Sequence, residues 1–287
     1  MASRTAYPIL VHRDIMSLSI ALARFCYYFP TEERGRVFIL MANSSSVDRR
    51  KFLKICAGAG AAVAASPSLM ARPAGALQPG ERVQLVDTHG HAVRPGSLTV
   101  GRSYVFHYPF VTTPCFLIDL GSPAEPGEEL LTSDGEPYRW SGGVGPGRSI
   151  VAFSAICAHK MSYPTRSVSF IDYRHKPVSG DGSGSNWWDR GQVIYCCSEG
   201  SVYDPRDGAR VMAGPAPQPL AAVSLEFVED EQALYATGIY GGDMLESFLD
   251  KFGFQVGLAH NTDDIWRPAS GSATVRPLDE YSRTGVC

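Results

Sequence analysis

The chain has 287 residues, of which 44% are hydrophobic and 19% charged, and its formal net charge at pH 7 is −3. This length allows one domain of moderate size with appendages, and the absence of a strongly basic composition argues against nucleic acid as a partner. With 29 Gly and 20 Pro and no long periodic helix, the composition predicts a turn-rich β protein.

The first part of the chain reads as a targeting segment. Arg49 and Arg50 precede an Ala- and Gly-rich stretch over residues 55–65, and small residues at 74–76 offer cleavage sites. The apolar stretch is too short to span a bilayer, and the pattern is similar to a twin-arginine export signal. We expect residues 41–76 to be this signal and residues 1–40 to be an over-extended N-terminus. The protein is then periplasmic, and an uncleaved leader would attach it to the membrane.

Short strand-like runs follow, separated by turns rich in Gly and Pro. Strands are expected over residues 82–86, 103–109, 115–120, 149–156, 169–173, 191–195, 222–228 and 233–240. One helix is expected over residues 243–252, and an irregular tail over 267–287. These elements predict an all-β fold, an antiparallel β-sandwich or small barrel, with a site built from loops at one end.

Two motifs lie at the ends of predicted strands. The first contains Cys157 and His159 in the order Cys-x-His, and the second contains Cys196 and Glu199 in the order Cys-x-x-Glu, followed by Gly-Ser-x-Tyr-Asp. Each motif places a soft thiolate close to a second possible ligand. Two such loops can close over a small iron–sulfur cluster.

The order and spacing of the two motifs resemble those of Rieske proteins, which bind a [2Fe–2S] cluster through two Cys on one iron and two His on the other. The resemblance implies that Cys157 and Cys196 hold the buried iron and that His159 holds the outer one. Where the family has its second His, this chain has Glu199. A Rieske-like domain is expected over residues 80–240, with its cluster-binding part at about 150–220, followed by a C-terminal extension over 241–287.

Residues near the motifs also agree with this alignment of the two motifs to the Rieske family. Respiratory members of the family have a disulfide at the positions of Ser162 and Ser198, so both halves of the pair are missing here, as in low-potential members. Gly200, Ser201 and Tyr203 stand where the family keeps hydrogen-bond donors to the cluster and ligand sulfurs. Residues 214–217, Gly-Pro-Ala-Pro, resemble the proline loop that covers the cluster.

Three segments resemble the small Rieske subunit of arsenite oxidase: residues 108–115, 142–146 and 150–153. The departures are Glu199 and a longer insert over residues 160–195, which contains Trp187 and Trp188 and changes the surface expected to meet a partner. The resemblance implies an electron-transfer subunit without substrate chemistry of its own. It would pass single electrons between a larger oxidoreductase, such as a molybdopterin enzyme, and a soluble or membrane acceptor.

The fourth ligand stays open at this point. Glu199 as a ligand would be a hard anionic donor that lowers the reduction potential relative to His. Glu199 as a free loop carboxylate would leave Cys197 or His175 to complete the site. The side chain of Cys197 should point away from an iron bound by Cys196, and His175 would need a fold-back to reach the site. We prefer Glu199.

Two other functions fit the same residues. The chain can be a non-redox scaffolding or binding subunit that keeps the fold and has lost the cluster. Alternatively, Cys157, His159, Cys196 and Glu199 form a mononuclear iron or zinc site with mixed N, S and O ligands. Seven cysteines in all are too few and too scattered to predict a disulfide scaffold, and Cys115 in an apolar strand is expected to be a buried structural thiol.

Overall fold

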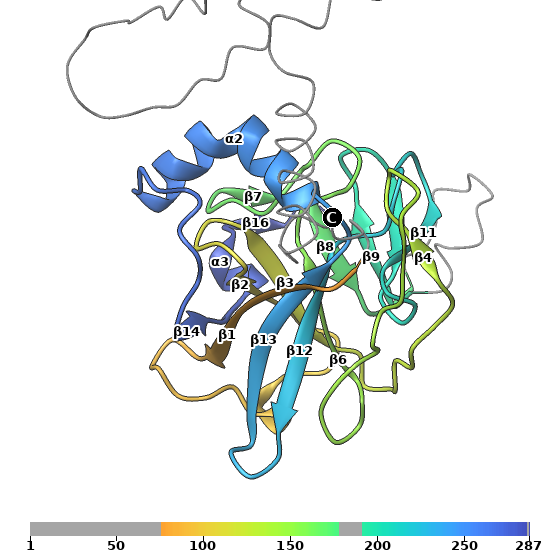
Figure 1. Ribbon diagram of the computed structural model, residues 1–287. Helices are drawn as coiled ribbons and strands as arrows, with labels where there is room; N and C mark the ends of the chain where they lie inside the picture. Colours follow the sequence, from red (N-terminus) through yellow and green to blue (C-terminus); the bar gives the residue numbers. More distant parts are fainter. Residues whose placement is uncertain (1–75, 178–190, 286) are drawn as a thin grey trace, which may run out of the picture. The chain divides into compact units, whose positions relative to one another are not determined.

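The computed structural model describes residues 76–177, 191–285 and 287 (Figure 1). The predicted export signal and residues 1–40 lie outside the described residues, as do Trp187 and Trp188. The described residues all belong to one compact unit. Within the described ranges, none of the helices has the length and apolar character needed to cross a membrane.

The main sheet has eight strands in the order β14-β1-β13-β12-β6-β3-β2-β15. In chain order they are β1 (Gln78–Val86), β2 (Ser103–His107), β3 (Pro114–Asp119), β6 (Ile150–Ser154), β12 (Ala222–Val228), β13 (Ala233–Tyr240), β14 (Ser272–Thr274) and β15 (Arg276–Pro277). Only Val275 separates the two edge strands β14 and β15 in the chain. The sheet therefore curls until its edges nearly meet, which confirms the predicted all-β fold and small barrel.

The central strands β2, β3 and β6 form the barrel core. In β3 every residue but the last is buried, and Phe116 lies directly opposite Val105 of β2 and Phe153 of β6. Aromatic and β-branched side chains pack well on a pleated surface that is covered on both faces, which is why this apolar run forms a central strand. Cys115 in β3 is a free, fully buried thiol, as predicted.

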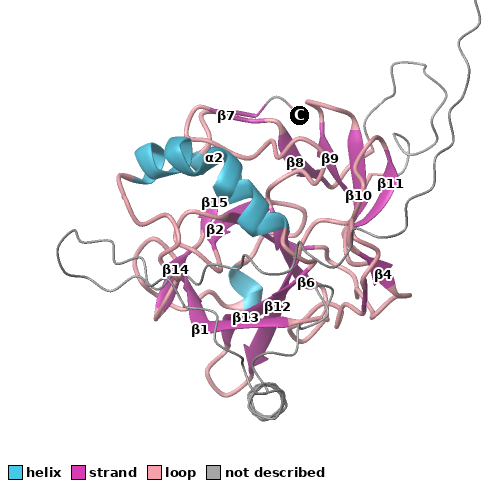
Figure 2. Cartoon of the chain, turned by 45° about the horizontal axis from the view of Figure 1, so that its top comes forward, coloured by secondary structure: helices cyan, strands magenta, loops and turns pink. Residues whose placement is uncertain are grey.

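A second sheet of four strands, in the order β11-β10-β9-β8, lies apart from the barrel strands β1, β13 and β12 (Figure 2). Its strands are β8 (Ile171–Arg174), β9 (Val193–Cys196), β10 (Ser201–Asp204) and β11 (Arg210–Ala213). The second motif forms the turn between β9 and β10. This sheet and the loop after β6 make the loop-built subdomain that the sequence predicts. Before residue 170 the chain also forms the short 3-10 helix η2 (Pro95–Ser97), the paired strands β4 (Leu130–Leu131) and β5 (Pro137–Tyr138), and the strand β7 (Val168–Ser169).

The prediction of an irregular tail over residues 267–287 is wrong. Besides β14 and β15, this region forms the short helix α3 (Leu278–Tyr281) and the strand β16 (Thr284–Gly285), which pairs with β7. A disulfide joins Cys287 to Cys197, 90 residues earlier. Spacing along the sequence cannot reveal such a pairing, because it depends on where the two Cα atoms meet in the fold.

Helix α2 (Met244–His260) extends eight residues beyond the predicted end at 252. Its buried face carries Phe248, whose ring meets the edge of Tyr163 with 4.9 Å between ring centroids. Tyr163 belongs to the loop that follows the first motif. The C-terminal extension therefore packs against this loop, and Figure 1 shows α2 beside β7 and β16.

Candidate metal centre

The first motif lies in a tight loop after β6. Cys157 N donates to Ser162 O at 2.9 Å, and Met161 N donates to Cys157 O at the same distance. Met161 has a φ of 61°, a left-handed backbone conformation that turns the chain back on itself. These contacts hold Cys157 completely buried at the base of the loop.

The second motif is a turn that the backbone closes. Gly200 N donates to Cys196 O at 2.8 Å, and Gly200 has a φ of 74°, which favours glycine. Cys196 is the last residue of β9 and faces Ser201, the first residue of β10. Both cysteines therefore sit on rigid backbone, and both are fully buried.

We call Cys157 and Cys196 the inner pair. Their side chains are hydrogen-bonded to each other, and the Tyr203 hydroxyl lies 3.3 Å from Cys157 Sγ while accepting a hydrogen bond from Ala158 N at 3.1 Å. The hydrogen bond from Cys196 lowers the pKa of Cys157 to about 5, and Tyr203 contributes further. The same contact and burial raise the pKa of Cys196. The inner pair thus stabilises one thiolate, the form in which cysteine binds metals.

We call His159 and Glu199 the outer pair. His159 Nδ1 lies 3.9 Å from Glu199 Oε2, and Lys160 Nζ lies 2.8 Å from Glu199 Oε1. The hydrogen bond from Lys160 holds the pKa of Glu199 below its usual value, so the carboxylate is anionic. Two ligand atoms on one tetrahedral metal lie about 3.4 Å apart. The outer pair is close to that separation.

One buried polar atom at this site, His159 Nδ1, has no hydrogen-bond partner. The His159 side chain is 27% exposed, so the ring presents its other edge to solvent and turns Nδ1 inward. Buried polar groups in folded proteins are normally satisfied. The unpartnered Nδ1 atom therefore fits a bound group with a metal that accepts a nitrogen ligand, such as an iron–sulfur cluster.

The candidate ligands come as two pairs. Among the described residues, no three or more His, Cys, Asp or Glu side chains gather closely enough to hold a metal ion. The inner pair offers two sulfurs, and the outer pair offers a nitrogen and an oxygen. A two-iron cluster needs two protein ligands for each iron, and the two pairs supply that number.

The other candidate fourth ligands are not at the site. Cys197 is bonded to Cys287, which confirms that its side chain points away from the inner pair. His175 Nδ1 lies 3.4 Å from Tyr173 Oη, and this histidine follows Arg174, the residue of β8 that pairs with Val193. Cys196 lies at the opposite end of β9, so the fold-back that His175 would need does not occur.

The proline loop covers the turn of the second motif. Gly214 has a φ of 87°, and a Cβ atom at this position would collide with Gly200 O and with Ser201 Cα. Gly214, the first residue of the predicted proline loop, therefore lies in direct contact with the backbone that follows Glu199.

No protein-family model matches the chain. Among solved structures, the chain is similar to the soluble domain of the Rieske protein II (soxF) from Sulfolobus acidocaldarius, with 25% sequence identity and a TM-score of 0.39. The match covers 57% of this chain and 81% of that chain.

Proposed function

We propose that the chain is an exported [2Fe–2S] protein of the Rieske type, which carries single electrons between a larger oxidoreductase and a soluble or membrane acceptor. The observation that carries the proposal is the meeting of the two motifs. They bring two hydrogen-bonded buried thiols together with a buried imidazole nitrogen that lacks a partner. When bound, the cluster supplies a centre that accepts and releases one electron.

The inner pair would hold the buried iron, and the outer pair would hold the iron nearer to solvent. Tyr203 and Ser201 would donate hydrogen bonds to sulfur, which stabilises the more negative, reduced state and raises the reduction potential. Glu199 would act in the opposite direction, because an anionic carboxylate favours the ferric state. Lys160 is placed to offset part of this negative charge.

Electron exchange would take place on the face where His159 reaches solvent. The two inner cysteines are fully buried, whereas the His159 side chain is 27% exposed and the neighbouring Lys160 side chain 60% exposed. An electron would therefore pass between the cluster and a partner through this face. The partner we propose is a molybdopterin enzyme similar to arsenite oxidase, in keeping with the segments at residues 108–115 and 142–146.

Export is part of the proposal. The disulfide between Cys197 and Cys287 supports it, because disulfides persist in oxidising compartments such as the periplasm and are rare in the cytosol. Replacing Arg49 and Arg50 with Lys should trap the protein in the cytoplasm, measured by cell fractionation. Unchanged periplasmic delivery would show that the segment is not a twin-arginine signal.

Purification of the full chain after maturation in vivo tests the function. We expect about two irons and an equal amount of acid-labile sulfide per chain. Reduction with dithionite should produce a rhombic electron paramagnetic resonance signal with a low average g. One metal per chain without sulfide would select the mononuclear site instead.

A second candidate is a scaffolding subunit without a cluster. The ion pair between Lys160 and Glu199 favours it, because the pair satisfies the carboxylate without any metal. The same measurements separate the two candidates. A chain that contains neither iron nor sulfide and gives no signal after reduction would exclude the electron carrier and leave the scaffold.

A further inference from the structure

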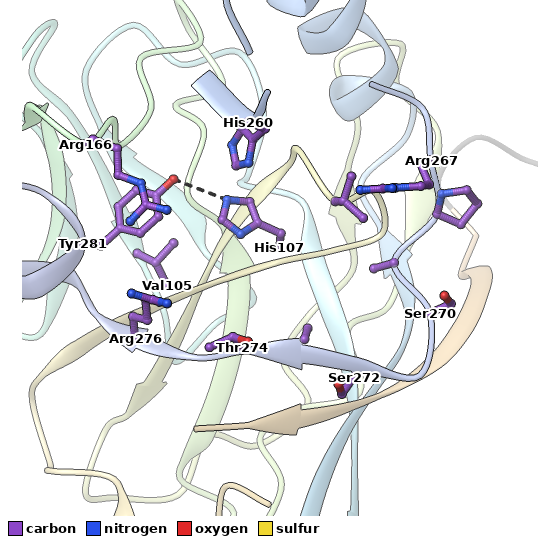
Figure 3. A pocket seen from close by; sticks show the side chains of 14 residues that line it. Val105, His107, Arg166, His260, Arg267, Ser270, Ser272, Thr274, Arg276 and Tyr281 are labelled. Atoms are coloured by element: carbon purple, nitrogen blue, oxygen red, sulfur yellow. Dashed lines mark hydrogen bonds between the residues drawn. The ribbon is translucent and has the colours of Figure 1, made fainter. Parts of the chain in front are cut away.

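A cavity of about 470 Å³ lies away from the two motifs, against β2 and β15. Its walls come from five parts of the chain: β2 with the loop that follows it, the loop that leads to β7, the C-terminal end of α2, the segment from Arg267 through β15, and α3. Figure 3 shows Arg267 reaching toward His107 from one side, while Arg166, Arg276 and Tyr281 lie on the other. The C-terminal extension therefore builds most of this cavity.

The cavity has cationic walls without a counter-charge. Arg166, Arg267 and Arg276 line it, and none of the residues that line it is an Asp or a Glu. Within the described ranges, these three arginines form no ion pair, whereas Arg102 and Arg210 are paired with carboxylates. Three guanidinium groups that share one cavity repel one another, so a bound anion would stabilise them.

Two histidines add hydrogen-bonding groups but no negative charge. The rings of His107 and His260 meet edge to face with 4.7 Å between centroids, and Tyr281 Oη lies 3.4 Å from His107 Nε2. Burial, with repulsion from His260 and Arg166, lowers the pKa of His107 to about 3. The ring is therefore neutral at pH 7. Burial is the main cause of this neutral state, and the nearby positive charge adds to it.

We propose that this cavity binds a small molecule bearing a phosphate-like oxyanion group. Guanidinium groups present parallel N–H donors that match the oxygens of phosphate or a similar oxyanion, and they approach the cavity from two sides. Ser270, Ser272 and Thr274 supply hydroxyl groups in the same lining. The volume lies within the range of about 300–1,000 Å³ typical of small-molecule sites, and a lone inorganic ion would fill little of it.

The proposal does not depend on the electron-transfer function, since none of the four candidate ligands lines the cavity. It can therefore fail or succeed by itself. Titration calorimetry on the full chain, at constant ionic strength adjusted with chloride, should detect saturable binding of inorganic phosphate or of 3-phosphoglycerate. Tighter binding of the organic phosphate would identify a phosphorylated metabolite as the ligand class, whereas equal binding would identify the free oxyanion.

The variants Arg267→Gln and Arg276→Gln should each weaken binding about tenfold or more, because each removes a charged hydrogen-bond donor. Arg139→Gln is the matched control, since Arg139 is exposed and lies outside the cavity. Arg267→Lys keeps the positive charge but loses the planar guanidinium group with its paired N–H donors. This variant tests the role of Arg267 if the Gln variant unfolds. Absence of saturable binding by both probes, or equal weakening by Arg139→Gln, would overturn the proposal.

Discussion

The inner and outer pairs of the candidate centre are built differently. Cys157 and Cys196 are fully buried and lie on closed turns of the backbone, and Cys157 Sγ lies 3.3 Å from the Tyr203 hydroxyl. His159 and Glu199 are each about one quarter exposed, and Glu199 is already satisfied by Lys160. The inner pair depends on packing that tolerates little change. The outer pair depends on local polar contacts at a partly exposed position, where a change of side chain is easier to accommodate.

The largest effect should follow from a change in the inner pair. Cys157→Ser or Cys196→Ser should abolish cluster binding, because a hydroxyl is a poor iron ligand at neutral pH and metal bonds also stabilise the surrounding loops. Visible absorbance, iron and sulfide content should all be lost. Cys115→Ser is the control, since Cys115 is equally buried but lies in β3. An inner-pair variant with full absorbance would refute the ligand assignment.

A change in the outer pair should have a graded effect. Glu199→Ala should lower iron and sulfide content strongly, because it leaves an open coordination position that water can enter. Glu199→His should retain the cluster and raise its reduction potential, since a neutral imidazole stabilises the ferric state less than a carboxylate does. Lys160→Gln serves as a control that removes only the ion pair. Full iron and sulfide in the Ala variant would show that Glu199 is not a ligand.

The disulfide next to the inner pair should contribute stability without supplying a ligand. Cys287→Ser opens a loop of 90 residues and should lower the free energy of unfolding by roughly 2–4 kcal/mol. Cys197→Ser should have the same effect, and chemical denaturation would measure both. Cluster content should stay close to that of the parent protein. Loss of the cluster in these variants would mean that the disulfide to the C-terminal residue, and not only the turn of the second motif, positions Cys196.

The smallest effect should come from the hydrogen bond to the inner pair. Tyr203→Phe removes the hydroxyl group that lies 3.3 Å from Cys157 Sγ, which should lower the reduction potential by an amount on the order of tens of millivolts. Protein-film voltammetry would measure the shift. Tyr173→Phe is a matched control, because its hydroxyl lies near His175 rather than at the centre. Equal shifts in both variants would remove the assigned role of Tyr203.

Much of the barrel could be predicted from the sequence. The apolar runs at 115–120, 222–228 and 233–240 coincide within a residue with β3, β12 and β13, because alternating or continuous apolar residues bounded by Gly and Pro determine strands locally. The short strands β10 and β11 were missed. They are four residues each, and β11 has no fully buried residue, so their existence depends on pairing with neighbouring strands.

The sequence by itself determined the two motifs and therefore the candidates Cys157, His159 and Cys196, since each motif lies within a few residues of chain. Only the tertiary structure decided the rest: the ion pair that Lys160 forms with Glu199, the disulfide to Cys287, and the cavity of three arginines. These features join segments from about 40 to more than 150 residues apart. Contacts over such separations depend on how a sheet closes and packs. The local periodicity of apolar residues predicts single helices and strands and does not predict these contacts.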